Sequence, residues 1–239
     1  PVSLYGQCSN FDEINAIANK YGIAVIEDAA QSFGGEYKGK KSCNLSTIGC
    51  TSFFPTKPLG CYGDGGAIFT SDDDLAQLIR QIARHGQKER YEHVRVGLNS
   101  RLDTIQAAVL IPKLKILDDE ICSRQKIASF YSSHLNLHKN CEAPQIDDGS
   151  LSAWAQYTIK TLKRDFVREC LLEDGIPTAV HYPCPLNKQP AYRNDTFQTP
   201  VADKLSHSVV SIPVHAYLDQ RAQDGILKSV QNALARSVN

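Results

Sequence analysis

A lysine between two prolines is the residue in this sequence best placed for covalent chemistry. Lys57 lies between Pro55 and Pro58 in the segment TSFFPTKPLGCYGDGG, which leaves an expected strand and ends in a glycine-rich turn. Isolated lysines are usually solvated surface charges. Because the prolines restrict the backbone on both sides, this lysine loses less conformational entropy when it is held in place. A fixed amine is what covalent nucleophilic catalysis requires.

A group of polar residues follows an earlier apolar run. In VIEDAAQSFG, an expected buried strand presents Glu27, Asp28, Gln31 and Ser32 at its carboxyl end. In open α/β sheets, ligands bind outside that edge. A carboxylate there can bind a metal, a ribose hydroxyl or a cationic ring nitrogen, but Asp28 can equally cap the following turn. The residues alone leave these alternatives open.

The elements that must position these residues alternate between helix and strand. Asn10 and Glu13 form a capping box for a helix that should end at Gly22. The run IAVIE that follows is short, β-branched and continuous, which is typical of a strand buried on both faces of a parallel sheet. Further short strands are expected at CTSFF (50–54) and GAIFT (66–70).

The second half of the chain becomes helical and then mixed. Ser71 and Asp74 form a second capping box for a helix that stops near Gly86. Residues 102–137 read as a helical region that Pro112 kinks or divides. Beyond Asn140, short strand-like and helical segments lead to a terminal helix from about Gln220 to Arg236. The pattern indicates an α/β fold with two domains, over residues 1–117 and 118–239.

Composition excludes several classes of protein. Lys plus Arg equals Asp plus Glu, at 26 each, which removes any global electrostatic argument for binding nucleic acid or a membrane surface. No apolar run is long enough to span a bilayer, and the first ten residues lack the pattern of a signal peptide, so we expect a cytoplasmic enzyme. The eight cysteines have no spacing that suggests a metal site.

Taken together, these motifs resemble those of the DegT/DnrJ-type sugar aminotransferases. The segments EDAAQSFG and TSFFPTKPLGCYGDGG carry the resemblance first. Later segments agree in family order: RHGQ (84–87), VGLNSRLDTIQAA (96–108), GIPTAVHYPCPLNKQPAY (175–192) and SIPVHAYL (211–218). The resemblance implies a pyridoxal-phosphate-dependent transferase of fold type I, with a mainly parallel sheet flanked by helices and a smaller α+β C-terminal domain.

The resemblance also implies roles for individual residues. Lys57 would hold pyridoxal 5'-phosphate as a Schiff base and then act as the base that moves a proton. Asp28 would face the pyridine nitrogen and keep it protonated. Gln31 would lie beside the ring hydroxyl, and Ser52 would donate to the cofactor phosphate.

The same resemblance assigns residues to a dimer interface and to a sugar pocket. Asn99 would reach the phosphate bound by the other subunit of a homodimer with shared active sites, and Arg101 would help to bind substrate there. His181 and Tyr182 would line the sugar-nucleotide pocket. Simpler roles stay open: Asn99 as the cap of the next helix, Arg101 in an interface ion pair, and His181 and His215 as core histidines.

The narrower resemblance is to bacterial transaminases that aminate C3 of a UDP-linked 2-acetamido-3-keto-hexuronic acid, with L-glutamate as amino donor, in O-antigen (lipopolysaccharide) biosynthesis. Alternatives are amination of another nucleotide keto sugar, such as a 4-keto-hexose, and a non-catalytic binding or regulatory protein on the same scaffold. A sugar dehydratase is a further alternative, but it would carry histidine in place of Lys57. Family members also have an N-terminal part of the large domain, with a backbone cup for the phosphate, that has no counterpart in this sequence.

Overall fold

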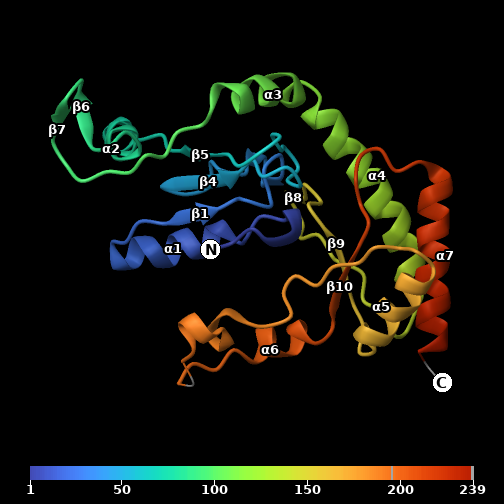
Figure 1. The fold of residues 1–239 in the computed structure, drawn as a ribbon. Coiled ribbons are helices and arrows are strands. Elements are labelled where there is room, and N and C mark those ends of the chain that lie inside the picture. The colour runs from blue at the N-terminus through green and yellow to red at the C-terminus, as the bar shows by residue number, and fades with distance from the viewer. Residues whose placement is uncertain (195, 238–239) are drawn as a thin grey trace. The chain divides into compact units, whose positions relative to one another are not determined.

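The computed structural model describes residues 1–194 and 196–237, which form two compact units (Figure 1). Unit 1 contains residues 1–121 and 146–155, and unit 2 contains residues 122–145 and the described residues from 156 onward. The segment 146–155 belongs to unit 1 because the Ala153 amide donates to the Gly6 carbonyl at 2.8 Å and strand β8 (Ser150–Leu151) pairs with strand β2 (Glu36–Tyr37). The boundary after residue 117, expected from the sequence, stays a prediction.

Unit 1 begins with the helix that the capping residues predict. Helix α1 (Phe11–Tyr21) starts after Asn10, whose side chain accepts from the Glu13 amide. It ends at Gly22, which has a φ of 63°, a left-handed conformation that glycine adopts without steric cost. The apolar side of α1 packs through Phe11 and Ala18 into a cluster that includes Val25, Tyr37 and Leu45. The capping box thus predicts the start of this helix, and Gly22 predicts its end.

The sheet that carries the candidate chemistry has three strands in the order β1-β4-β5. Strand β1 (Ile26–Asp28) runs parallel to β4 (Ile48–Ser52), and β4 is antiparallel to β5 (Gly66–Phe69). The sheet is therefore mixed. Beyond β4, a second cluster joins the following loop to the helices: Phe53, Leu59, Cys61, Leu110, Leu117, Ile121 and Ala153.

One sequence-based expectation for this sheet is wrong. The run IAVIE was expected to be buried on both faces, but β1 alternates, with Glu27 buried and Ile26 and Asp28 exposed. Ile26 is 57% exposed, and Ile68 on β5, which lies on the same face, is 53% exposed. The described residues therefore leave much of this face exposed. A continuous apolar run shows only that a strand is compatible with burial on both faces. Whether both faces are buried depends on which segments pack against them.

The helices that follow differ in detail from expectation. Helix α2 (Asp73–Ala83) is capped by Asp72, whose carboxylate accepts from the Leu75 amide, and not by Ser71. Pro112 lies inside helix α3 (Thr104–Leu114), which ends two residues later, and α4 (Leu117–Leu135) follows. Unit 1 also contains the 3₁₀ helix η1 (Leu4–Gly6), β3 (Lys40–Lys41), and the hairpin of β6 (Gln87–Glu89) and β7 (Glu92–His93).

Unit 2 encloses nearly all of its small sheet. Strand β9 (Tyr157–Lys160) is antiparallel to β10 (Val209–Ile212), and all their residues are buried except Lys160, which is partly buried. Helices α5 and α7 pack against each other, with Val167, Leu171 and Val230 fully buried. The bounds of the remaining elements are α5 (Arg164–Glu173), η2 (Leu186–Lys188), η3 (Pro190–Tyr192), α6 (Pro200–Ser206) and α7 (Gln220–Arg236).

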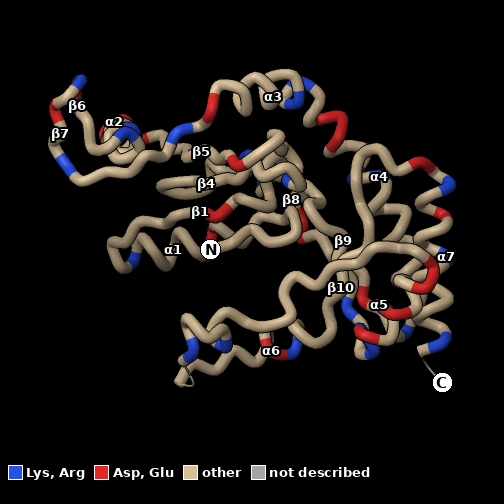
Figure 2. Tube along the Cα trace, in the orientation of Figure 1, with Lys and Arg blue, Asp and Glu red and all other residues tan. Residues whose placement is uncertain are grey.

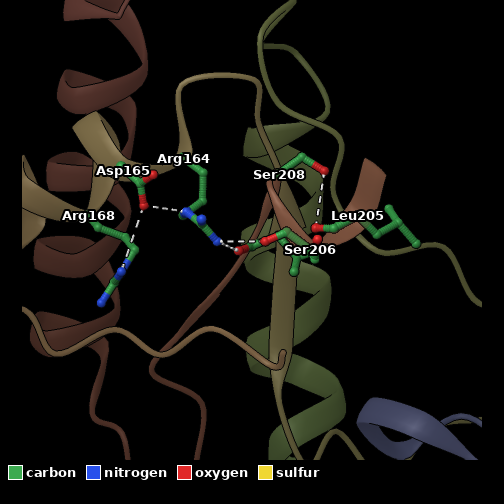
Figure 3. Close-up of polar contacts among 7 residues, drawn as sticks. Arg164, Asp165, Arg168, Leu205, Ser206 and Ser208 are labelled. Carbon is green, nitrogen blue, oxygen red and sulfur yellow. Dashed lines mark hydrogen bonds and ion pairs between the residues drawn. The ribbon is translucent and has the colours of Figure 1, made fainter. Parts of the chain in front are cut away.

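A buried arginine joins α5 to the chain that enters β10 (Figure 3). The Arg164 guanidinium donates from Nη1 to the Ser206 carbonyl at 3.1 Å and to the Val209 carbonyl at 3.4 Å. Its Nε donates to the Asp165 carboxylate at 2.5 Å. Buried charges require such partners. The contacts therefore make Arg164 a structural residue of unit 2.

Charges of both signs are interspersed along the trace (Figure 2). This distribution agrees with the balanced composition of the sequence. Among the described residues, no helix has the length and apolar character needed to cross a membrane.

Candidate functional site

The register between β1 and β4 brings the proposed acidic and phosphate-binding residues to one edge of the sheet. Asp28 is the partner of Cys50 in the parallel pairing, and Ser52 lies two residues further along β4. Side chains two residues apart on a strand share a face. Asp28, Cys50 and Ser52 therefore lie on the face that the described residues leave open, at the carboxyl ends of both strands.

The carboxylate of Asp28 is only partly engaged. Its Oδ1 accepts from the Ala30 amide at 3.0 Å, which is the turn-capping contact expected as one alternative. No further contact involves its side chain within the described part of the chain. The residue is exposed. One carboxylate oxygen thus fixes the turn and the other is available to a ligand.

The loop that carries Lys57 is closed on itself. The Phe53 carbonyl accepts from the Cys61 amide at 2.8 Å, which brings the two ends of residues 53–61 together. Lys113 of α3 donates from Nζ to the Gly60 carbonyl at 2.5 Å. A Cβ at Gly60 would lie 2.7 Å from the Pro55 carbonyl oxygen, so only glycine fits this close approach. The loop is therefore held from both ends and from the adjoining helix.

Lys57 lies between buried residues of this loop. Phe53 and Leu59 are buried in the cluster that includes Leu110, and the Lys57 amide donates to the Phe54 carbonyl at 2.9 Å. The lysine side chain is half-buried. Its ammonium has no hydrogen-bond or ion-pair partner among residues 1–194 and 196–237. A fixed backbone with an unengaged amine is the arrangement that a covalent nucleophile requires.

Ser52 and Gln31 differ in how much bonding capacity they retain. The Ser52 hydroxyl oxygen accepts from the Phe54 amide at 3.2 Å, which leaves its hydrogen available for donation. The Gln31 side chain is buried, and its Oε1 accepts from the Tyr5 amide at 2.8 Å. Ser52 is thus free to donate to an anion, whereas the Gln31 carbonyl group already holds the chain at η1.

Asn99 and Arg101 are neighbours after the β6–β7 hairpin. The Arg101 Nε donates to the Asn99 Oδ1 at 2.9 Å, and Asn99 forms an isolated bridge with Arg84. Both residues are exposed. Asn99 does not cap α3, because Asp103 occupies the N-cap position. The alternative of a capping role for Asn99 is therefore wrong.

His181 and Tyr182 belong to unit 2. The His181 Nδ1 lies 3.0 Å from the Ser211 Oγ, and that hydroxyl lies 2.9 Å from the Thr158 Oγ1 on β9. The rings of His181 and Tyr182 meet edge to face, with centroids 5.6 Å apart. Tyr182 is exposed and His181 is partly buried. Two buried hydroxyls therefore orient the imidazole.

Burial and carboxylates keep the thiols near the sheet protonated. Burial raises the pKa of Cys8 to about 11 and that of Cys43 to about 12, and the negative charge of Glu27 adds to both shifts. The pKa of Cys50 is raised by burial first and then by Asp28 and Glu27. A thiolate is the reactive form of cysteine. These thiols are consequently poor nucleophiles, and all eight cysteines are free.

Two cavities lie apart from these residues. One, of about 730 Å³ in unit 1, is lined by residues of β5, α2, α4 and the chain between β3 and β4. The other, of about 480 Å³ in unit 2, lies beside His215 and Gly225. Neither is lined by Lys57, Asp28 or His181. The candidate site is defined by the register of β1 with β4 and by the geometry of the Lys57 loop.

Comparison with known proteins decides the family. The family model described as "DegT/DnrJ/EryC1/StrS aminotransferase family" matches residues 1–231. The chain belongs to this family. The family depends on pyridoxal phosphate, and its solved members share the type I fold.

Similar proteins come from several bacteria. The chain is 62% identical, over 92% of its length, to a UDP-2-acetamido-2-deoxy-3-oxo-D-glucuronate aminotransferase of Pseudomonas aeruginosa and covers 61% of that protein. It is 42% identical over 96% of its length to a pleiotropic regulatory protein of Geobacillus stearothermophilus, of which it covers 63%. A crystal structure of a family aminotransferase from Brucella abortus matches 97% of this chain with a TM-score of 0.94 at 42% identity, and 63% of that chain is covered. The chain therefore spans less than two thirds of the length of these relatives.

The chemical groups of three residues in unit 1 are suited to binding pyridoxal phosphate. An unengaged ammonium at Lys57, a free carboxylate oxygen at Asp28 and a hydroxyl donor at Ser52 follow the same pair of strands. These groups correspond to the aldehyde, the ring nitrogen and the phosphate of the cofactor.

Sequence reasoning placed Glu27 and Ser32 with the ligand-facing residues, and this was wrong. Both side chains are fully buried and hydrogen-bonded to other parts of unit 1. The signal was present, because neighbouring residues on a strand point to opposite faces, so Glu27 and Asp28 could not both face a ligand.

Proposed function

We propose that this chain carries residues of the active site of a transaminase that aminates a UDP-linked 2-acetamido-3-keto-hexuronic acid, with L-glutamate as amino donor, in polysaccharide (O-antigen) biosynthesis. The observation that carries the proposal is the fixed but unengaged Lys57 amine downstream of the strand beside Asp28. The 62% identical Pseudomonas protein, named for the amination of such a sugar, supports the substrate class.

In this proposal each residue has a separate task. Pyridoxal phosphate, when bound, supplies a ring that accepts electrons from a carbanion. Lys57 would hold the cofactor aldehyde through Nζ and, when that amine is free, would carry a proton on the same atom. Asp28 holds a proton on the ring nitrogen through its charge, and the Ser52 hydroxyl binds the phosphate. Gln31 would place its amide beside the ring hydroxyl.

Substrate binding is assigned to Arg101, His181 and Tyr182. The guanidinium suits the uronate or pyrophosphate oxygens of the sugar nucleotide. The imidazole of His181 is oriented by Ser211. The aromatic ring of Tyr182 is exposed and can stack on a base or sugar.

The proposal includes a homodimer with shared sites. Helix α3 exposes Ile105, Ile111 and Leu114, an apolar surface of the kind that interfaces cover. Asn99 lies on the segment before this helix and would reach the cofactor phosphate of the partner subunit. Asn99→Ala should then weaken cofactor retention in the dimer, and unchanged affinity would remove the shared-site assignment. A cytoplasmic location, expected from the sequence, stays a prediction.

Covalent trapping tests the central assignment. The protein is incubated with pyridoxal phosphate and reduced with borohydride, and peptides are analysed by mass spectrometry. The cofactor mass should appear on the peptide containing Lys57 and should be absent in Lys57→Ala. Lys88→Ala, a change at an exposed hairpin lysine, serves as the control and should leave the label on Lys57. Labelling that persists at another lysine in Lys57→Ala would show that the wrong amine is assigned.

A non-catalytic regulatory role is the second candidate, favoured by the 42% identical relative that is named as a pleiotropic regulatory protein. The two functions differ in their response to an amino donor. For the transaminase, glutamate should bleach the visible band of the bound cofactor. A protein that binds the cofactor but keeps that band with every amino donor would support the regulatory role.

A further inference from the structure

Glu27 is a carboxylate with no described role, although it precedes Asp28 directly. Its side chain is fully buried, on the face of β1 opposite to Asp28. No cation lies within ion-pair distance of it among the residues that the structure describes. A buried charge without a cation persists only when hydrogen bonds satisfy it.

The donors that satisfy Glu27 all come from the chain that leads into β4. The Cys43 amide donates to Oε1 at 2.9 Å and the Leu45 amide to Oε2 at 3.3 Å. The Ser42 hydroxyl donates to Oε1 at 3.0 Å and lies 2.6 Å from the Ser32 hydroxyl. Charge-assisted bonds of this kind are among the strongest that a protein makes. The carboxylate therefore ties residues 42–45 to β1.

The same chain segment is pressed against β4. A Cβ at Gly49 would lie 2.4 Å from the Cys43 carbonyl oxygen and 2.6 Å from its Cα, so the backbone of Cys43 occupies the place of a side chain. Cys43 has a φ of 72°, a left-handed conformation that non-glycine residues adopt rarely. Gly49 is also the register partner of Glu27. Glu27, Cys43 and Gly49 thus form a three-residue contact across the two strands, the Glu27–Cys43–Gly49 lock.

The pairing that this lock spans is short. Strands β1 and β4 share three partner pairs, from Ile26↔Ile48 to Asp28↔Cys50. A slip of one residue would reverse the face on which every side chain of one strand lies. Asp28 would then point into the closed face, while Ser52 and Lys57 would stay with β4. Hydrogen bonds from the Ala29 amide to the Cys50 carbonyl at 2.7 Å and from the Ile48 amide to the Val25 carbonyl at 3.2 Å extend this pairing, and the lock adds a side-chain constraint to it.

We infer that Glu27 is a positioning residue, which fixes the register of β1 against β4 and thereby places Asp28 relative to Ser52 and Lys57. The inference rests on the proposed function, because the positioned groups are the proposed cofactor ligands. Glu27 itself does not touch the cofactor and acts through Cys43 and Gly49.

The test replaces the acceptor without changing its size. In Glu27→Gln, an NH₂ group faces the amide of either Cys43 or Leu45, so one bond is lost. Pyridoxal phosphate affinity of the folded protein should fall by up to about tenfold, because cofactor binding must then also restore the register that the lost charge-assisted hydrogen bond held. The pH midpoint of the visible cofactor band should shift, and the Cys43 and Leu45 amides should exchange hydrogen faster. Ser42→Ala is a milder second variant with the same expected directions.

Two comparisons keep the outcomes apart. Glu92→Gln, a change at an exposed carboxylate in β7, should match the wild type in all three measurements. If Glu27→Gln and Ser42→Ala lower only the melting temperature, and the folded fraction keeps wild-type affinity and pH midpoint, the inference is overturned. In that case the proposed function still stands, provided that Asp28→Asn and Lys57→Ala impair cofactor binding. If those two variants also leave cofactor binding unchanged, the proposed function itself has failed.

Discussion

The sheets of the two units differ in what covers them. In unit 2, β9 and β10 are buried along nearly their whole length. In unit 1, β1 and β4 have one closed face with Glu27 and Gly49 and one open face with Asp28 and Ser52. A strand with a closed face and an open face can use alternate residues for packing and for chemistry. The candidate cofactor residues lie on the open side of such strands.

The candidate residues of the two units differ in the same way. Lys57 in unit 1 has a fixed backbone and an unengaged ammonium. His181 in unit 2 is joined to the buried hydroxyls of Ser211 and Thr158. A free amine in a fixed place is suited to form a covalent bond, whereas hydrogen bonds to buried hydroxyls set the orientation of the imidazole.

The largest expected effect separates the enclosed sheet from the open one. Ile159→Ala, at a fully buried position in β9, should destabilise unit 2 by about 2–5 kcal/mol. Ile26→Ala, on the open face of β1, should change the stability of unit 1 by less than about 0.5 kcal/mol. Urea-dependent hydrogen exchange of the β9 and β10 amides follows unit 2, and fluorescence of Trp154, the single tryptophan, follows unit 1. Equal losses in the two variants would remove the contrast.

An intermediate effect concerns pH on the closed side of unit 1. Burial raises the pKa of Cys8 from 9.0 to about 11, so the folded protein keeps this thiol protonated at pH values where the unfolded chain loses the proton. The resulting stability is present below pH 9 and is lost as pH rises toward 11, on the order of 3 kcal/mol at most. Cys8→Ala should reduce the loss of stability with rising pH, as measured by urea unfolding. Cys122→Ala, at an exposed thiol, should not, and a decline that is unchanged in Cys8→Ala would contradict the assignment.

The smallest effect compares two serines beside candidate residues. Ser211→Ala leaves the buried Thr158 hydroxyl without this partner and should cost about 1–2 kcal/mol. Ser52→Ala removes only a bond from the Phe54 amide and should cost less than that. Thermal unfolding measures both. A loss in Ser52→Ala equal to or larger than that in Ser211→Ala would contradict this comparison.

Local signals predicted much of the fold. The capping box at Asn10 and the glycine at position 22 mark both ends of α1, and the terminal helix spans residues 220–236 as expected. Local hydrogen bonds determine such ends, so they can be identified from neighbouring residues. The cap of α2 was assigned one residue too early, at Ser71, because two adjacent side chains were both able to cap. Strand burial was not predictable in this way, since distant segments decide it.

The sequence by itself determined which chemical groups are available: a lysine between two prolines, an aspartate after an apolar run, and a family pattern that continues to residue 231. Only the tertiary structure decided how they are used. It placed Asp28 on the open face and Glu27 on the closed one, tied Gln31 to Tyr5, and left Lys57 unengaged. The reason is physical, because residue type is a property of one position, whereas burial, register and hydrogen-bond partners depend on segments that are distant in the chain.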